Sequence, residues 1–229
     1  KKIVISYFKI LRDMKKTLLT IAFVIVMTIS ASAQFKPFQF GLKVEPGVNW
    51  SKLNSEHLYD SKTSLNFNWG FVGNYYFVEN YGFSTGFNVR FMSGEYSFDH
   101  TTTTTTKIRR TIKNQYLEIP IGLIMRTEKM GDIRIIGNIG YGLGFLLNSK
   151  ERNYDENDNE KSLDKSSSYS SVRHALIVKL GIEYYVSRSS CITAAFVFNN
   201  NIANIYSSKD DYKHDVLLNN LGLEIGFMF

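Results

Sequence analysis

Charged side chains recur at alternate positions within regular runs of this sequence, and they are the first candidates for chemistry. A β-strand sends alternate side chains to opposite faces, so charges spaced in this way share one face of a sheet. Buried charges persist only when they are paired and hydrogen-bonded. The pattern therefore predicts a structural ion-pair network, made of four cations and four carboxylates: Lys43, Glu45, Arg90, Glu118, Arg134, Lys179, Glu183 and Glu224.

Metal and catalytic chemistry find less support. The four histidines, which are His57, His100, His174 and His214, have neither i, i+4 nor His-x-His spacing. They fall in or beside predicted loops, which leaves a surface metal site conceivable but favours solvated histidines. The run Asp155–Glu160 resembles the start of a calcium loop, yet it lacks the glycine at the sixth position and the glutamate at the twelfth. No nucleophile lies beside a base in a supporting context. We expect no metal, no cofactor and no enzymatic activity.

The charged positions lie in segments that alternate between apolar and polar residues. In the last segment, Leu221, Leu223, Ile225 and Phe227 alternate with glycines around Glu224. No segment has a helical period. Glycines on the polar face, as at Gly140–Gly144, make room for large side chains of neighbouring strands. Eight such segments are predicted as strands, namely Phe38–Trp50, Ser64–Val78, Tyr81–Phe98, Arg110–Arg126, Asp132–Asn148, Val172–Val186, Ser190–Ile205 and Asn219–Phe229.

The connections between these strands alternate between short and long. Short ones lie at Glu79–Asn80, at Thr127–Gly131 and near Arg188; long ones are Ser51–Thr63, Asp99–Arg109, Ser149–Ser171 and Tyr206–Asp215. In an outer-membrane barrel, short turns face the periplasm and long loops face outside. The sequence therefore predicts an all-β, eight-stranded antiparallel up-and-down transmembrane β-barrel, with the apolar face toward lipid. The run Thr101–Thr106 is either a flexible tip or an extension of strands above the membrane, since threonine favours β structure.

The first 33 residues have the three parts of a secretory signal peptide. Met14-Lys15-Lys16 opens a positively charged stretch, Leu18–Ser30 is mainly apolar, and Ala31-Ser32-Ala33 fits a cleavage site. An uncleaved anchor is the alternative, but a spanning helix requires about 20 apolar residues. We expect residues 1–33 to be a cleaved signal peptide with an extension upstream of Met14, and residues 34–229 to form the barrel.

Bulk charge does not indicate nucleic-acid binding. The net charge is +6, but six of the 27 basic residues and one of the 21 acidic residues fall within positions 1–33, which leaves +1 for the remainder. The one cysteine, Cys191, excludes an intrachain disulfide and is interpreted as a small strand residue.

Three stretches carry a family resemblance. Gln115–Leu123, QYLEIPIGL, resembles a recurring strand of the PorT-like outer-membrane β-barrel family. Phe40–Val44 with Gly47–Ser51 resembles its first strand, and the closing LGLEIGFMF resembles its last. The resemblance implies an eight-stranded barrel in the outer membrane, surrounded by its lipids, and no known reaction. Phe229 resembles the terminal aromatic residue that the barrel-assembly machinery reads.

Three functions are compatible with these observations. The leading one is a structural or interaction barrel, whose lumen is closed by ion pairs and whose extracellular loops contact a protein partner or the envelope. The second is a small-solute channel or a component of transport or secretion, against which the balanced inner charges argue. The third is a soluble lipocalin-like barrel, in which the apolar face would line a ligand cavity.

Overall fold

The computed structural model describes residues 37–53, 58–101, 105–155, 157, 159–161, 169–206 and 216–229. The predicted signal peptide at residues 1–33 lies outside these ranges, as do His57 and His214. Within them, no helix is long and apolar enough to cross a membrane. The strands of the described part are β1 Phe38–Leu53, β2 Leu58–Lys62, β3 Ser64–Val78, β4 Tyr81–Thr101, β5 Thr105–Arg126, β6 Ile133–Tyr154, β7 Glu160–Lys161, β8 Val172–Tyr185, β9 Cys191–Asn201 and β10 Val216–Met228.

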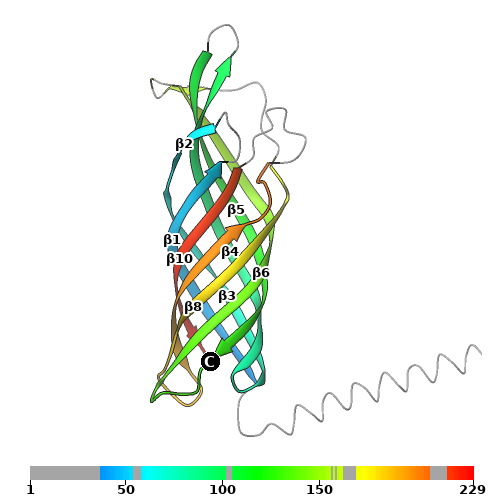
Figure 1. Cartoon of the computed structure of the whole chain (residues 1–229), viewed down its shortest axis with the longest axis vertical. Helices are drawn as coiled ribbons and strands as arrows, with labels where there is room; N and C mark the ends of the chain where they lie inside the picture. Colours follow the sequence, from blue (N-terminus) through cyan, green and yellow to red (C-terminus); the bar gives the residue numbers. More distant parts are fainter. Residues whose placement is uncertain are drawn as a thin grey trace, which may run out of the picture. The chain divides into compact units, whose positions relative to one another are not determined.

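Eight of these strands close into a barrel (Figure 1). The order around the ring is β1, β3, β4, β5, β6, β8, β9 and β10, and β10 pairs again with β1. Every pairing is antiparallel, and neighbours in the ring follow one another along the chain apart from the short β2 and β7. The predicted all-β, eight-stranded up-and-down barrel is confirmed.

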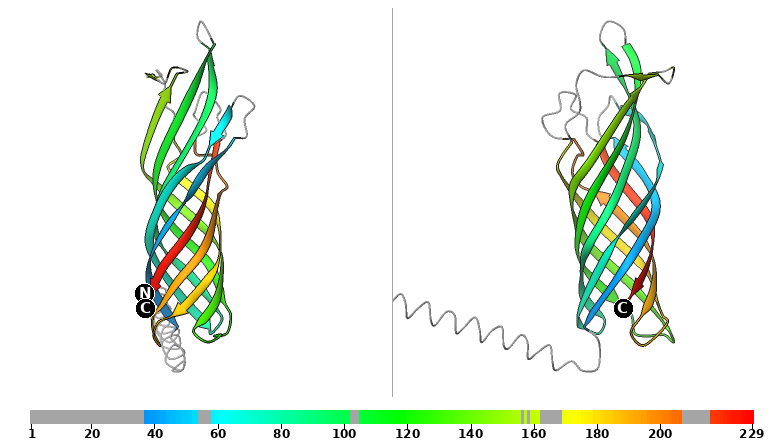
Figure 2. Two further views of the ribbon diagram at one scale, coloured as in Figure 1. Left: turned by 90° about the vertical axis from the view of Figure 1, so that its left-hand side faces the viewer. Right: turned by 180° about the vertical axis from the view of Figure 1, so that it is seen from behind.

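Three of the segments predicted as long loops are partly β-strand in the structure. β4 and β5 stay paired from Tyr81 opposite Met125 to Thr101 opposite Thr105, so the expected loop Asp99–Arg109 was wrong. β6 runs to Tyr154 and pairs there with β7, and β2 pairs with β4 inside the expected loop Ser51–Thr63. The threonine run extends the two strands at its described ends, because β4 ends at Thr101 and β5 begins at Thr105. The β4–β5 hairpin reaches farthest from the end that holds the C-terminus (Figures 1 and 2).

The short connections lie together at the end of the barrel that holds the C-terminus (Figure 1). Glu79 and Asn80 form the turn from β3 to β4, and Gly131 adopts φ +65° in the turn before β6. That left-handed backbone conformation favours glycine. Phe229 follows β10 and exchanges two backbone hydrogen bonds with Phe40, of 3.0 and 2.7 Å, which ties the end of the chain to the first strand.

The outer face of the barrel is apolar. Phe67, Phe87 and Phe227 are 50%, 42% and 48% exposed, and so are the outward apolar residues of β5 and β10, such as Leu123 and Ile225. The polar partners of these residues in the alternation are buried, as for Glu118 and Glu224. A lipocalin-like barrel would require the opposite arrangement, with the aromatic set inside, so that alternative is not favoured.

Candidate functional site: a buried ion-pair network inside the barrel

The centre of the barrel is occupied by Arg90, which lies between two carboxylates. Its Nε donates to Glu118 Oε1 at 2.7 Å, while Nη1 and Nη2 donate to the two oxygens of Glu45 at 3.0 and 3.1 Å. The three side chains come from β4, β5 and β1 and are at most 2% exposed. Arginine suits this position because its planar guanidinium binds carboxylates through several directed hydrogen bonds at once.

Arg173 extends this cluster to β8. Its Nη1 donates to Glu118 Oε2 at 2.8 Å, and Asn199 of β9 donates to the same oxygen at 3.1 Å. Each carboxylate also accepts a hydrogen bond from an asparagine: Asn68 donates to Glu45 at 3.1 Å, and Asn88 donates to Glu118 at 3.2 Å. We call Glu45, Arg90, Glu118 and Arg173 the central cluster. Its two positive and two negative charges balance.

Glycines on the inner face make room for these side chains. A Cβ at Gly142 would lie 2.9 Å from Glu118 Oε2, and one at Gly222 would lie 2.6 Å from Glu45 Cγ. A Cβ at Gly144 would meet the Cβ of Arg173 at 3.2 Å. The expectation that inner-face glycines accommodate large neighbours is confirmed at these positions. The glycines and the charges therefore form one packed interior.

A second cluster contains two ammonium groups and one carboxylate. Lys43 Nζ of β1 donates to Glu224 Oε2 at 2.7 Å, and Lys179 Nζ of β8 donates to Oε1 at 2.9 Å. The two lysine side chains are 10% exposed and Glu224 is 3% exposed. The pairing links β1, β10 and β8 across the lumen.

Two further predicted residues lie near the short turns and do not pair with each other. Arg134 and Glu183 are opposite in the register of β6 and β8. Arg134 instead donates to Glu79 of the β3–β4 turn at 2.8 Å, while Glu183 accepts from Tyr185 at 2.9 Å and lies 3.9 Å from Arg126. The network therefore includes a turn residue, Glu79, and a tyrosine, Tyr185, in addition to the eight charged residues predicted from the alternation.

The predicted set of four cations and four carboxylates was therefore incomplete. Arg173, Arg126 and Arg110 also face inward, and Arg110 pairs with Glu151 at 3.0 Å. The sequence carried a signal for all three, because Arg173 continues the alternation of Lys179 and Glu183, and Arg110 and Arg126 continue that of Glu118. The guanidinium of Arg126 lies 3.6 Å from the ring centroid of Tyr76 on β3, a contact that the alternation does not predict.

An apolar cluster lies above the central cluster, toward the long strands. There the inner face itself becomes apolar: Ile108 and Ile112 of β5 continue the inward positions of Glu118 and are buried, whereas Ile119 and Ile121 point outward. Beside this cluster, Tyr169 donates to Glu151 at 2.6 Å. Burial, and then the charge of Glu151, raise the pKa of Tyr169, so its hydroxyl stays protonated. The cluster of buried residues is Leu58, Met92, Tyr96, Phe98, Ile108, Ile112, Tyr116, Ile205, Tyr206, Val216 and Leu218.

The other candidates do not form a site in the described ranges. His174 lies on β8 and contacts the Tyr141 hydroxyl on the outer face. The side-chain placement of His100 falls outside the described residues. Asp155 accepts backbone hydrogen bonds from Asn157 and Asn159, as in a local turn. No group of three His, Cys, Asp or Glu side chains that could hold a metal occurs among the residues described.

Comparison with known proteins supports the outer-membrane assignment. The sequence profile of the family described as "Outer membrane protein beta-barrel domain" matches residues 30–207. No curated protein sequence matches significantly.

Several solved structures of outer-membrane proteins are similar at low identity. The attachment invasion locus protein Ail of Yersinia pestis is 16% identical, with 85% of this chain and 100% of that chain covered and a TM-score of 0.40. Neisserial surface protein A is 13% identical over 82% and 95% of the two chains, with a TM-score of 0.41. The protease OmpT of Escherichia coli is 10% identical over 86% and 98%, with a TM-score of 0.40.

The family match covers well over half of the chain, and the apolar outer face and closed eight-stranded ring agree with it. The protein belongs to the outer membrane protein β-barrel domain family and lies in the outer membrane.

Proposed function

We propose that this protein is a PorT-like barrel with a structural or interaction role and a lumen closed by ion pairs. The observation that carries the proposal is the central cluster. Arg90 is 1% exposed while it contacts carboxylates from two other strands, and Arg173 joins the second carboxylate from a fourth strand. An eight-stranded barrel is just wide enough for its own side chains to fill.

The hydrogen bonds of this cluster involve seven of the eight barrel strands. Side chains come from β1, β4, β5 and β8, together with asparagines of β3, β9 and β10. β6 contributes glycines that lie against Glu118 and Arg173. A pore through this layer would separate ion pairs that lie in a water-poor interior, which is strongly unfavourable. The lumen charges therefore serve stability, and no catalytic role is assigned to them.

The same proposal places the interaction surface on the long strands. With the short turns in the periplasm, the extensions of β4, β5 and β6 project outside the cell, where a protein partner can reach them. Residues 1–33 act as the cleaved export signal, and residues 34–229 form the mature barrel. Phe229, which is 58% exposed beside the first strand, serves as the signal for the barrel-assembly machinery. Replacing it with Ser should slow insertion and leave the lumen unchanged.

Single-channel recording on the purified monomer in a planar bilayer tests the closed lumen. We expect no steady nanosiemens conductance from the wild-type protein. As a positive control, Glu45→Ser with Arg90→Ser removes one ion pair of the central cluster and should produce openings. Steady conductance from the wild type would contradict the proposal and favour the channel or transport alternative.

A further inference from the structure

The barrel wall has a break between β3 and β4 on the side toward the long strands. The two strands pair from Trp69 opposite Val89 toward the short turn, where Val78 lies opposite Tyr81 after a shift in register. Beyond Trp69, the β3 residues Ser64–Asn68 pair only with β1, and β4 continues with β5. Along this stretch of the described strands, no backbone ladder joins β3 to β4.

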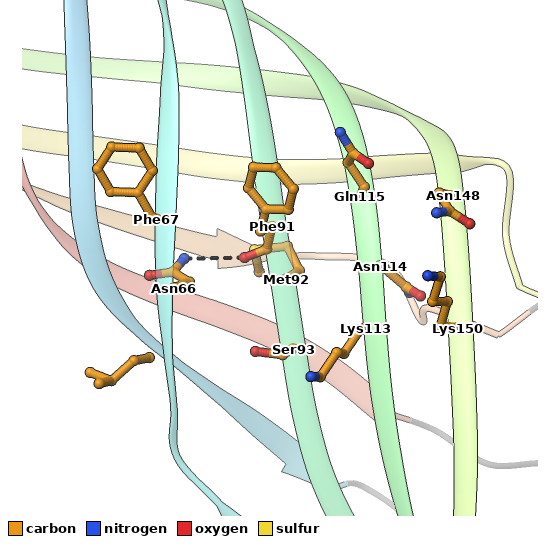
Figure 3. A pocket seen from close by; sticks show the side chains of 11 residues that line it. Asn66, Phe67, Phe91, Met92, Ser93, Lys113, Asn114, Gln115, Asn148 and Lys150 are labelled. Atoms are coloured by element: carbon orange, nitrogen blue, oxygen red, sulfur yellow. Dashed lines mark hydrogen bonds between the residues drawn. The ribbon is translucent and has the colours of Figure 1, made fainter.

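Side chains replace the missing ladder. Asn68 Oδ1 accepts from the backbone N–H of Phe91 at 3.0 Å, and Asn66 Nδ2 donates to the carbonyl of Phe91 at 3.3 Å (Figure 3). Ser64 Oγ donates to the carbonyl of Ser93 at 3.2 Å. Unpaired backbone groups at membrane depth are unfavourable. The polar residues of β3 therefore compensate for strands that stand apart here.

A groove of about 760 Å³ lies over this break, within the range of small-molecule sites. Its apolar side is made by Leu65, Phe67 and Phe91, of which Leu65 is 85% exposed. Its other side is polar and carries Lys113 and Lys150 from β5 and β6 (Figure 3). The groove thus has one wall suited to hydrocarbon and one suited to an anion.

The two lysines are placed as if for a shared anion. Lys113 and Lys150 are direct partners in the β5–β6 register, and like charges opposite one another are destabilising. Neither has an acidic partner among the described residues. Two other outward cations on the same strands have acidic partners: Lys107 pairs with Asp60 at 2.5 Å, and Arg152 pairs with Glu160 at 4.0 Å.

The height of the lysines fits the surface of the membrane. On the outer face of β5, the exposed apolar residues Ile121 and Ile119 lie below the groove, and the outward residues become polar from Gln115 to Lys113, at the height of the groove. The lysines therefore lie at the upper edge of the apolar belt, which is where lipid headgroups lie.

We propose that this groove binds one phosphate-bearing membrane lipid, with an acyl chain along Leu65, Phe67 and Phe91 and the phosphate between Lys113 and Lys150. The lysines donate charge-assisted hydrogen bonds to the phosphate oxygens and thereby relieve their mutual repulsion. The proposal requires the outer-membrane location and not the closed lumen, so the conductance result does not decide it.

Lipid retention in native mass spectrometry tests the proposal. The barrel is released from nanodiscs of mixed phosphatidylcholine and phosphatidylglycerol with identical acyl chains, and the bound lipids are counted. The wild type should retain one phosphatidylglycerol in preference to phosphatidylcholine. Lys113→Gln with Lys150→Gln should lower that preference by about tenfold or more, because two charge-assisted hydrogen bonds are lost. Heat-modifiable gel mobility shows that each variant is folded.

A matched control removes two cations from the same strands. Lys107→Gln with Arg152→Gln should leave the retained lipid unchanged, and so should Leu180→Ser on β8, whereas Phe67→Ser should weaken retention. Equal loss in both double variants would show general charge attraction and overturn the site. Retention that survives Lys113→Gln with Lys150→Gln would overturn it too. Displacement of the lipid by equimolar inorganic phosphate would overturn the acyl-chain contact.

Discussion

Removing the Glu118 carboxylate is the most direct perturbation of the interior. Its two oxygens accept from Arg90 at 2.7 Å and from Arg173 at 2.8 Å, and it is 0% exposed. In Glu118→Ala, Arg90 keeps Glu45, whereas the hydrogen-bond acceptor that Arg173 keeps is the neutral amide oxygen of Asn199. Breaking one side of a buried ion pair typically destabilises a protein by about 3–5 kcal/mol. We expect a loss in that range, due chiefly to Arg173.

The assay is urea unfolding of the barrel in lipid vesicles, followed by tryptophan fluorescence and gel mobility. Arg173→Met retains much of the arginine's volume and removes its charge. The double variant Glu118→Ala with Arg173→Met should therefore lose less stability than the sum of the single variants, by at least about 1.5 kcal/mol.

A rim ion pair provides the control for this experiment. Glu95 pairs with Lys62 at 2.7 Å on the outer face, where the two side chains are 25% and 61% exposed. Solvent screens such pairs, so Glu95→Ala should change the free energy of unfolding by less than about 1 kcal/mol. If Glu118→Ala were as mild as this control, and additive with Arg173→Met, the interior would be wet and the ion-pair reasoning would be refuted.

Three further predictions follow from packing. Gly70→Val should prevent folding, as judged by heat-modifiable mobility, because even a Cβ there would lie 2.2 Å from the carbonyl oxygen of Phe87; Gly131→Ala, which meets nothing within 4 Å, is the tolerated comparison apart from its backbone strain. Leu223→Arg on the outer face should destabilise the barrel by up to about 2–4 kcal/mol in vesicle unfolding, with the largest effect at the bilayer midplane. Cys191, which is fully buried, should react with maleimide only after unfolding, and rapid labelling of the folded barrel would contradict this burial.

The alternation in the sequence was sufficient to assign most side chains to a face. Leu223 points outward and Glu224 inward because a pleated strand has a period of two, and no tertiary information enters that rule. The number of barrel strands and the grouping of short turns at one end follow from the same pattern. The strand ends did not, because β4 and β5 continue above the barrel, where the inner face becomes apolar at Ile112 and Ile108.

The partners of the charges were decided by the tertiary structure. Arg134 and Glu183 are opposite in register, yet Arg134 pairs with Glu79 and Glu183 lies beside Arg126. The break between β3 and β4, and the groove over it, are likewise absent from the pattern of either strand. The physical reason is that the period of a strand fixes the direction of a side chain, while the stagger of neighbouring strands and the closure of the ring fix which side chains reach the same height in the lumen.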